Sequence, residues 1–359
     1  MEQNKKIRVA ITHGNTNGIG YEVILKALED PMMLELCTPV IYGSPKVAAY
    51  HRKAMELQTQ FTIIDRADEA KPGKVNLLTT VDDEIKVELG SNTPEAAEAA
   101  KRAKECALKD VAEGLCDVLV LAPESQEDSQ GKSENGSLDI RISGDLRIAL
   151  VTNEMAIKDV PEAITQQKII DKVKLLNSTL RRDFRISTPR IAILALNPIA
   201  GENGNGGEEE QETIKPAIER LEQEGIQAFG PYPTDKFFGN GDYQFFDAVL
   251  AMYYEQGVTP LKTIAPEGGI ILTTGLNYIQ TTTDEGAQFD IAGKGPADES
   301  ALRNAIYMAI DAFRNRQNYE EPLQNPLPKL YHEKRDESER IRFSVPKTKQ
   351  VPPTTQDKG

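Results

Sequence analysis

Apolar, strand-like runs alternate with helix-like segments along most of this chain, and that alternation limits the folds open to it. The strand-like runs lie at 7–12, 39–43, 118–121, 147–151 and 190–194. Helical patterns lie between or after them, at 21–28, 94–113, 157–180 and 208–224. Strands that alternate with helices predict an α/β fold with a largely parallel sheet. Ligand-binding loops are then expected at the carboxyl ends of the strands.

The helix expected at 94–113 has the clearest start signal in the chain. Thr93 can cap its first turn, Pro94 suits the first helical position, and Glu95 is favoured near the positive end of the helix dipole. Gly114 can end the helix, because glycine readily adopts the left-handed conformation found there.

A chain of 359 residues is long for one hydrophobic core and suits two domains. The stretch at 124–136 is polar and has no apolar period, which predicts an exposed loop. Residues 319–359 are rich in proline and in charge and have few large apolar side chains. Such a composition predicts a disordered tail, although it leaves open an interaction role for that tail.

The composition excludes several classes of partner. The net charge of −14 disfavours nucleic acid and anionic membrane surfaces. No run of about 18 apolar residues exists and the first residues lack an apolar signal core, so neither a membrane span nor secretion is expected. Three cysteines, Cys37, Cys106 and Cys116, fit no disulfide framework and no metal-ligand spacing. Cytoplasmic residence is the expectation.

The turn at 14–20 follows the first strand and precedes a helix. Its glycines, Gly14, Gly18 and Gly20, would let backbone N–H groups approach a phosphate group at the helix N-terminus. We therefore expect these three residues to bind a nucleotide cofactor or another phosphate. The alternative is that they serve only close packing. His13, just before the turn, is expected to be a hydrogen-bonding loop residue.

Several motifs resemble one known family. The stretches 195–202 and 250–257 resemble two signature motifs of 4-hydroxythreonine-4-phosphate dehydrogenase, an enzyme of pyridoxal phosphate biosynthesis. The stretch 10–22 is similar to the opening motif of the same family, with Asn15 in place of its aspartate. Collinear similarity extends with gaps over 7–316. Its further matches are 122–123, 147–152, 158–160, 230–232 and 290–295.

The resemblance implies a homodimer whose subunits each have two α/β/α domains with a cleft between them, as in isocitrate and isopropylmalate dehydrogenases. The first domain would comprise 1–125 with 287–318, and the second, carrying the dimer interface, 126–286. The cleft would bind NAD and phosphohydroxythreonine. A divalent metal ion there (Zn, Mg, Mn or Co) would polarise the substrate as a Lewis acid. The family holds this ion with three histidines, and its sites are completed across the dimer interface.

This chain departs from the family at all three histidine positions. They match Glu154, Ile199 and Tyr254. Isoleucine has no donor atom, and tyrosine is an uncommon ligand. Glu154 could bind a hard cation such as Mg²⁺, but one carboxylate makes no tight site. The sequence therefore predicts that the divalent metal ion is not bound.

The substrate positions depart as well. The lysine of the family matches Lys262, whereas its asparagine and arginine match Ile271 and Gln280. Losing that arginine removes a bidentate phosphate contact. The histidine of a second family motif falls on Glu285, after Asp284, and the Gly-His-Thr-Glu motif expected after 122–123 is missing. Added carboxylates would repel a phosphate dianion.

Two functions remain in view. The first is a ligand-binding or regulatory pseudoenzyme, which binds a small phosphorylated ligand and could pair with an active paralogue and inhibit it. The second is an active NAD-dependent dehydrogenase on the same or a related phosphorylated hydroxy acid, with an altered metal site. Lys262 could form a Schiff base, bind phosphate or be a remnant. Glu154 could form a general acid/base pair with Glu255 or Glu285.

Overall fold

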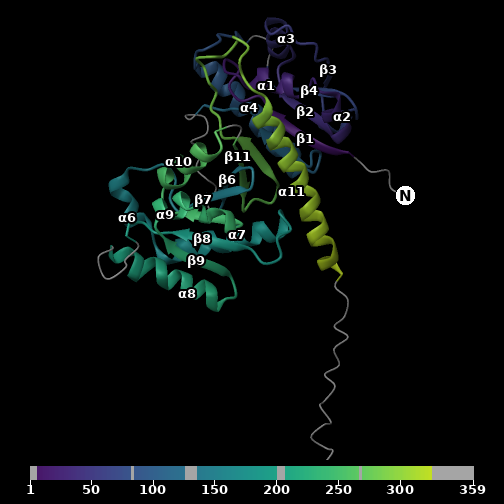
Figure 1. Cartoon of the computed structure of the whole chain (residues 1–359). Helices are drawn as coiled ribbons and strands as arrows, with labels where there is room; N and C mark the ends of the chain where they lie inside the picture. Colours follow the sequence, from purple (N-terminus) through teal and green to yellow (C-terminus); the bar gives the residue numbers. More distant parts are fainter. Residues whose placement is uncertain (1–5, 82–84, 126–135, 200–206, 267–268, 326–359) are drawn as a thin grey trace, which may run out of the picture. The chain divides into compact units, whose positions relative to one another are not determined.

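One mixed sheet organises the computed structural model, which describes residues 6–81, 85–125, 136–199, 207–266 and 269–325. The order of its strands is β3-β4-β2-β1-β5-β12-β11-β6-β7-β10-β8-β9. Figure 1 shows the strands with helices packed around them. The strands are β1 (Ile7–Thr12), β2 (Cys37–Gly43), β3 (Phe61–Ile64), β4 (Val75–Thr79), β5 (Val118–Leu121), β6 (Leu138–Ser143), β7 (Leu146–Leu150), β8 (Arg190–Leu194), β9 (Gln227–Tyr232), β10 (Ala248–Ala251), β11 (Ile270–Thr274) and β12 (Gln280–Thr283).

Most neighbouring strands run parallel, which confirms the predicted α/β fold. The exception is the middle of the sheet, where β11 runs antiparallel to both β12 and β6, and β6 runs antiparallel to β7. The sequence patterns did not predict this antiparallel insertion. A tight turn at Gly144, which has a φ of +56°, joins β6 to β7.

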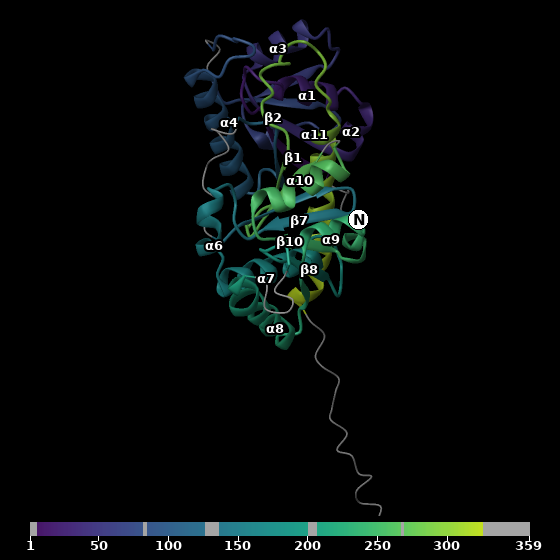
Figure 2. The same ribbon diagram turned by 60° about the vertical axis from the view of Figure 1, so that its left-hand side comes forward.

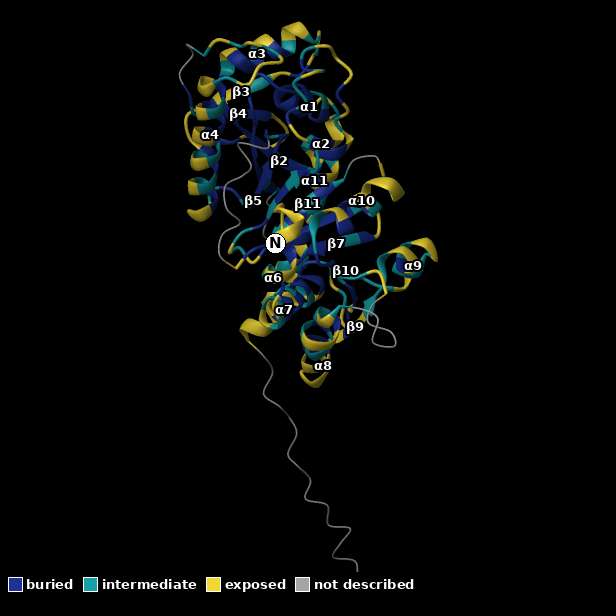
Figure 3. Ribbon diagram, turned by 90° about the vertical axis from the view of Figure 1, so that its left-hand side faces the viewer, coloured by how far each residue is buried: buried dark blue, intermediate teal, exposed yellow. Residues whose placement is uncertain are grey.

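The helices pack on the two faces of this sheet. They are α1 (Gly20–Ala27), α2 (Pro31–Leu36), α3 (Pro45–Ala54), α4 (Pro94–Ala112), α6 (Val160–Ala163), α7 (Gln166–Arg182), α8 (Lys215–Gln223), α9 (Thr234–Gly239), α10 (Tyr254–Ile264) and α11 (Ser300–Gln324). The view in Figure 2 separates α4 from α7 and α8. In Figure 3 the strands are mostly buried, whereas the outer faces of the helices are exposed.

The start of α4 is the one that the sequence predicts. The side chain of Thr93 accepts a hydrogen bond from the backbone N–H of Ala96, and Pro94 is the first helical residue. Gly114, with a φ of +73°, lies just past the end of the helix. The buried alanines of α4 then pack against β1, β2 and β5.

The prediction of one helix over 157–180 was wrong. A 3-10 turn at Ile157–Asp159 leads into the short α6, and α7 begins afresh after Thr165. Thr165 is extended, and its hydroxyl accepts a hydrogen bond from Lys168 N. A capping side chain satisfies a free N–H at a new helix start, and this local bond outweighs the continuous apolar period.

Helix α11 contributes much of the core on its side of the sheet. Leu302, Ile306 and Ile310 are buried in the main hydrophobic cluster, and Thr281 Oγ1 on β12 donates a hydrogen bond to Ala305 O. The helix continues to Gln324, past position 319, where a disordered tail was predicted to begin. Residues 326–359 of that tail, and 126–135 of the predicted loop, lie outside the described residues. The division of the preceding chain into two domains stays a prediction.

Within the described residues, no helix combines the length and the apolarity that a membrane span requires.

Candidate functional site

The motif at 250–257 is held in place by one buried glutamine. Gln256 Oε1 accepts a hydrogen bond from Met252 N at 2.6 Å, and its Nε2 donates to Ala195 O at 2.6 Å. The same Nε2 donates to Thr234 Oγ1. Gln256 thereby ties the start of α10 to the end of β8, the two places that carry the family-like motifs. It orients Tyr254 and Lys262 through the helix on which they lie.

Lys262 forms an ion pair with the carboxylate that follows β12. Its Nζ lies 3.2 Å from Asp284 Oδ2, and the side chain of Lys262 is 54% exposed whereas that of Asp284 is 10% exposed. The backbone N–H of Asp284 donates to Gly269 O, just before β11. Lys262 therefore has a counter-ion fixed at the end of β12, and its functional role stays a prediction.

A second cation, Arg141 on β6, reaches the same carboxylate. Arg141 Nε lies 3.7 Å from Asp284 Oδ1, too far for a hydrogen bond. Nε and Nη1 of Arg141 are buried and have no hydrogen-bond partner among the described residues. The guanidinium lies over the ring of Tyr254, 5.3 Å from its centroid. A cation over an aromatic face is stabilised by the ring quadrupole.

Sequence reasoning missed Arg141. The available signal was a charged residue between Ile140 and Ile142 in an alternating apolar strand. Such a side chain is expected to face solvent, yet Arg141 is only 9% exposed. On the adjacent strand it pairs with Ile271, one of the positions that the resemblance relates to substrate binding. Gln280, the other position, donates to Thr273 Oγ1 at 3.4 Å.

Glu285 adds a partly buried carboxyl group beside these charges. Burial raises its pKa, the negative charges of Asp298 and Asp284 raise it further, and Lys262 opposes them. Glu154 and Glu255 are exposed. The predicted acid/base pairing of Glu154 with Glu255 or Glu285 is untested and stays a prediction.

The other two positions matched to metal ligands are exposed residues that follow strands. Glu154 follows β7 and Ile199 follows β8, and Ile199 is 52% exposed. Near Ile199, the backbone N–H of Asn197 donates to the buried carboxylate of Glu210 at 2.7 Å. Across the described parts of the chain, no three His, Cys, Asp or Glu side chains gather as a metal site would require.

The turn at 14–20 is buried and its polar groups are largely used within the protein. The backbone N–H groups of Asn17, Gly18 and Ile19 donate to Asn15 Oδ1, Asn15 O and Ala287 O. The Asn17 side chain donates to Ser91 O and Thr93 Oγ1.

The glycines of this turn lie against backbone. A Cβ at Gly14 would collide with Pro123 O, one at Gly18 with Ala287 O, and one at Gly20 with His13 O. This geometry favours the packing role of Gly14, Gly18 and Gly20, and their cofactor binding stays a prediction.

His13 does not make the expected hydrogen bonds. Both ring nitrogens are buried and without a hydrogen-bond partner among the described residues. The ring stacks on Tyr21 at a centroid distance of 4.8 Å, and Tyr21 stacks on His51 at 5.3 Å. Burial lowers the pKa of His13 to about 4, against a smaller opposing effect of the Gly14 backbone, and burial also lowers the pKa of His51. His13 is thus a neutral packing residue.

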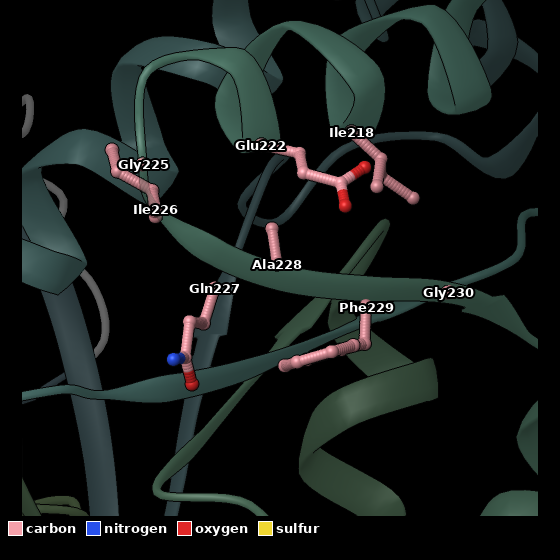
Figure 4. Close-up of a pocket in the computed structure, with 8 residues that line it drawn as sticks. All are labelled: Ile218, Glu222, Gly225, Ile226, Gln227, Ala228, Phe229 and Gly230. Atoms are coloured by element: carbon pink, nitrogen blue, oxygen red, sulfur yellow. The ribbon is translucent and has the colours of Figure 1, made fainter. Parts of the chain in front are cut away.

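A surface groove of about 430 Å³ lies elsewhere, between α8 and the edge strand β9. Figure 4 shows its lining, with Ile218 and Glu222 on the helix and Phe229 on the strand. It contains no residue that the sequence predicts to be functional. We therefore place the candidate site at α10 and the end of β12.

Comparisons with known proteins agree with the motifs. Residues 35–309 match the family model described as pyridoxal phosphate biosynthetic protein PdxA. A 4-hydroxythreonine-4-phosphate dehydrogenase of Bacteroides thetaiotaomicron is 48% identical, with 96% of this chain and 99% of the relative covered. One of Sulfurihydrogenibium is 36% identical, with 85% and 98% covered. The solved structure of a putative 4-hydroxythreonine-4-phosphate dehydrogenase from Salmonella typhimurium has a TM-score of 0.75 and 27% identity, with 86% and 100% covered.

Proposed function

Because this chain belongs to the family of pyridoxal phosphate biosynthetic protein PdxA, we propose that it descends from a metal-dependent dehydrogenase and no longer performs that reaction. Its retained role is to bind a small phosphorylated ligand, and the role is regulatory rather than catalytic. The observation that carries the proposal is the environment of Tyr254, where a guanidinium lies 5.3 Å from the ring centroid.

The residues at the three matched positions do not fit a divalent metal ion. Ile199 has no donor atom, and the single carboxylate of Glu154 makes no tight site. A tyrosine binds a metal ion well only as a phenolate. Tyr254 also lies next to the permanent positive charge of Arg141, which would repel the metal ion. A fixed positive charge at this point disfavours a second cation and favours an anion.

A specific observation favours the alternative, an active NAD-dependent dehydrogenase acting on 4-phosphohydroxythreonine or a related hydroxy acid. A curated dehydrogenase is 48% identical over 96% of this chain. In that case Glu154, with carboxylates such as Asp284, would supply oxygen ligands for a hard cation. The turn at 14–20 adds little support for NAD, because three of its N–H groups already donate within the protein.

The test is NADH formation from 4-phosphohydroxythreonine by the purified chain, with Mg²⁺, Mn²⁺ and Zn²⁺ in turn. The Bacteroides thetaiotaomicron relative is the positive control. We expect no turnover with any metal. Turnover within about a hundredfold of the control, a barrier difference under about 3 kcal/mol, would overturn the proposal in favour of the alternative.

We propose that the protein acts in the cytoplasm as a homodimer, as the resemblance implies. In a heterodimer with an active paralogue, each active site shared between the subunits would lack metal ligands from this chain. Pairing should therefore inhibit the paralogue. Co-expression of the two chains with different tags, followed by activity measurement on the mixed dimer, tests this. Full activity per active subunit in the mixed dimer would exclude inhibition.

A further inference from the structure

We propose that Arg141 and Lys262 together form a metal-independent binding site for one oxyanion, a phosphate or carboxylate group of a small ligand. The inference deepens the proposed function and rests on its premise that the ligand is held without a metal ion. The two cations come from β6 and α10 and converge on one carboxylate, that of Asp284.

The guanidinium of Arg141 has unsatisfied N–H groups. Nε and Nη1 of Arg141 have no hydrogen-bond partner among the described residues, although both are buried. Burying these N–H groups without hydrogen bonds has a free-energy cost, which the ion pair with Asp284 at 3.7 Å offsets only in part. A ligand oxyanion that accepts these N–H groups recovers that cost, because hydrogen bonds between charged partners are among the strongest in proteins.

The local charge around Arg141 and Lys262 also favours an anion. Among the described residues, Asp284 is the one carboxylate within ion-pair distance of Arg141 or Lys262. Burial raises the pKa of the neighbouring Glu285 and favours its neutral form, which leaves the two cations with an excess positive charge. The chain as a whole carries a net charge of −14. A local cationic pair on an acidic protein is therefore a specific feature of this place, since a general attraction for anions is absent.

The side chain of Arg141 is held in place by its neighbours. Tyr254 lies beneath its guanidinium, and the residue is held on the central strand β6 between β7 and β11. Such packing limits the rotamers of a long side chain and lowers the entropy lost on binding. Asp284 then acts as the internal counter-ion that holds the pair while no ligand is bound, and the oxyanion competes with it.

The experiment is titration calorimetry of the full chain in EDTA, with inorganic phosphate in one series and acetate in another. The wild-type chain is expected to bind one anion per subunit, and the tighter of the two identifies the group recognised. Arg141→Met and Lys262→Met should each weaken binding about tenfold or more, the value of one lost charged hydrogen bond.

Asp284→Asn separates this site from a merely structural ion pair. Removal of the internal counter-ion should strengthen anion binding about tenfold, since both cations become free. Arg147→Met is the matched control, because Arg147 also stacks on an aromatic ring, that of Phe184, and donates to Asp145 O and Asp247 O. That variant should bind phosphate as the wild type does.

Unchanged anion binding in both Arg141→Met and Lys262→Met, or no binding of either anion by the wild type, overturns the inference. Lys262→Met keeps the test valid if Arg141→Met does not fold, because Lys262 is 54% exposed. The proposed function is judged separately. If the chain forms NADH and also binds an anion in EDTA through Arg141, only the proposed loss of catalysis is refuted. If the chain forms no NADH and binds neither anion, only the proposed anion site is refuted.

Discussion

The guanidinium of Arg141 lies over the ring of Tyr254, 5.3 Å from its centroid, and joins a strand in the middle of the sheet to the first residue of α10. Tyr254 is the position that the resemblance matches to a metal-binding histidine. A permanent cation therefore lies beside the position that the resemblance relates to metal binding. This one contact links the proposed loss of metal binding to the proposed preference for an anion.

The contact predicts an energetic coupling between Arg141 and a restored metal site. The variant Glu154→His, Ile199→His, Tyr254→His should gain affinity for Zn²⁺, because imidazole is a good zinc ligand. Adding Arg141→Met should strengthen Zn²⁺ binding at least about tenfold more, since it removes a nearby like charge. Competition with a chromophoric chelator measures both. Equal Zn²⁺ affinity with and without Arg141 would show that the guanidinium does not face the metal position.

Acid should destabilise the protein through His13. Burial holds the pKa of His13 at about 4 in the folded state, whereas the unfolded value is about 6.5. The unfolded chain therefore binds more protons between these values, and stability is lost as pH falls through that window. From pH 7 to pH 5 the loss from this group is about 2 kcal/mol. Urea unfolding at both pH values measures it.

His13→Phe is the matched variant for this titration. Phenylalanine keeps the stack on Tyr21, and the imidazole nitrogens make no hydrogen bond that would be lost among the described residues. The variant should unfold with a shallower pH dependence and no loss of stability at pH 7. The same pH slope in wild type and variant would assign the acid sensitivity to other groups, such as His51, whose pKa burial also lowers.

The attachment of α11 should depend on a buried ion pair. Arg316 Nη2 lies 2.8 Å from Asp183 Oδ2, and Asp183 is also paired with Arg182 and has a fully buried side chain. Removing one partner of such a pair leaves an uncompensated charge, so Asp183→Asn should lower the free energy of unfolding by about 3 kcal/mol. Arg66→Met, which breaks the exposed pair with Asp68, is the control and should have no measurable effect. Equal stability of both variants would mean that α11 is held by its apolar face alone.

The turn at 14–20 should be intolerant of a single methyl group. Gly20→Ala would press its Cβ against His13 O, and the neighbouring backbone is buried. Overpacking of this kind should destabilise the fold by about 1–3 kcal/mol. Gly239→Ala, at the end of α9, meets no atom within 4 Å and serves as the control. A Gly20→Ala variant with wild-type stability in thermal unfolding would return the glycines to the predicted ligand role.

The helix at 94–113 shows how far local signals reach. Its cap, its first proline and its end could all be predicted, because they depend on residues within one helical turn of each other. The break in the helix expected at 157–180 could not be predicted, because the choice between one helix and two depended on the single capping hydrogen bond of Thr165. A continuous apolar period does not reveal such a break.

The sequence alone determined the alternation of strands and helices and the motifs at 195–202 and 250–257. It also determined that the side chain at Ile199 has no metal-donor atom. They are properties of neighbouring residues or of single side chains. The tertiary structure alone decided that Arg141, Tyr254, Lys262 and Asp284 meet. Their meeting depends on the antiparallel placement of β11 between β6 and β12, and strand order is set by long-range pairing that no local pattern encodes.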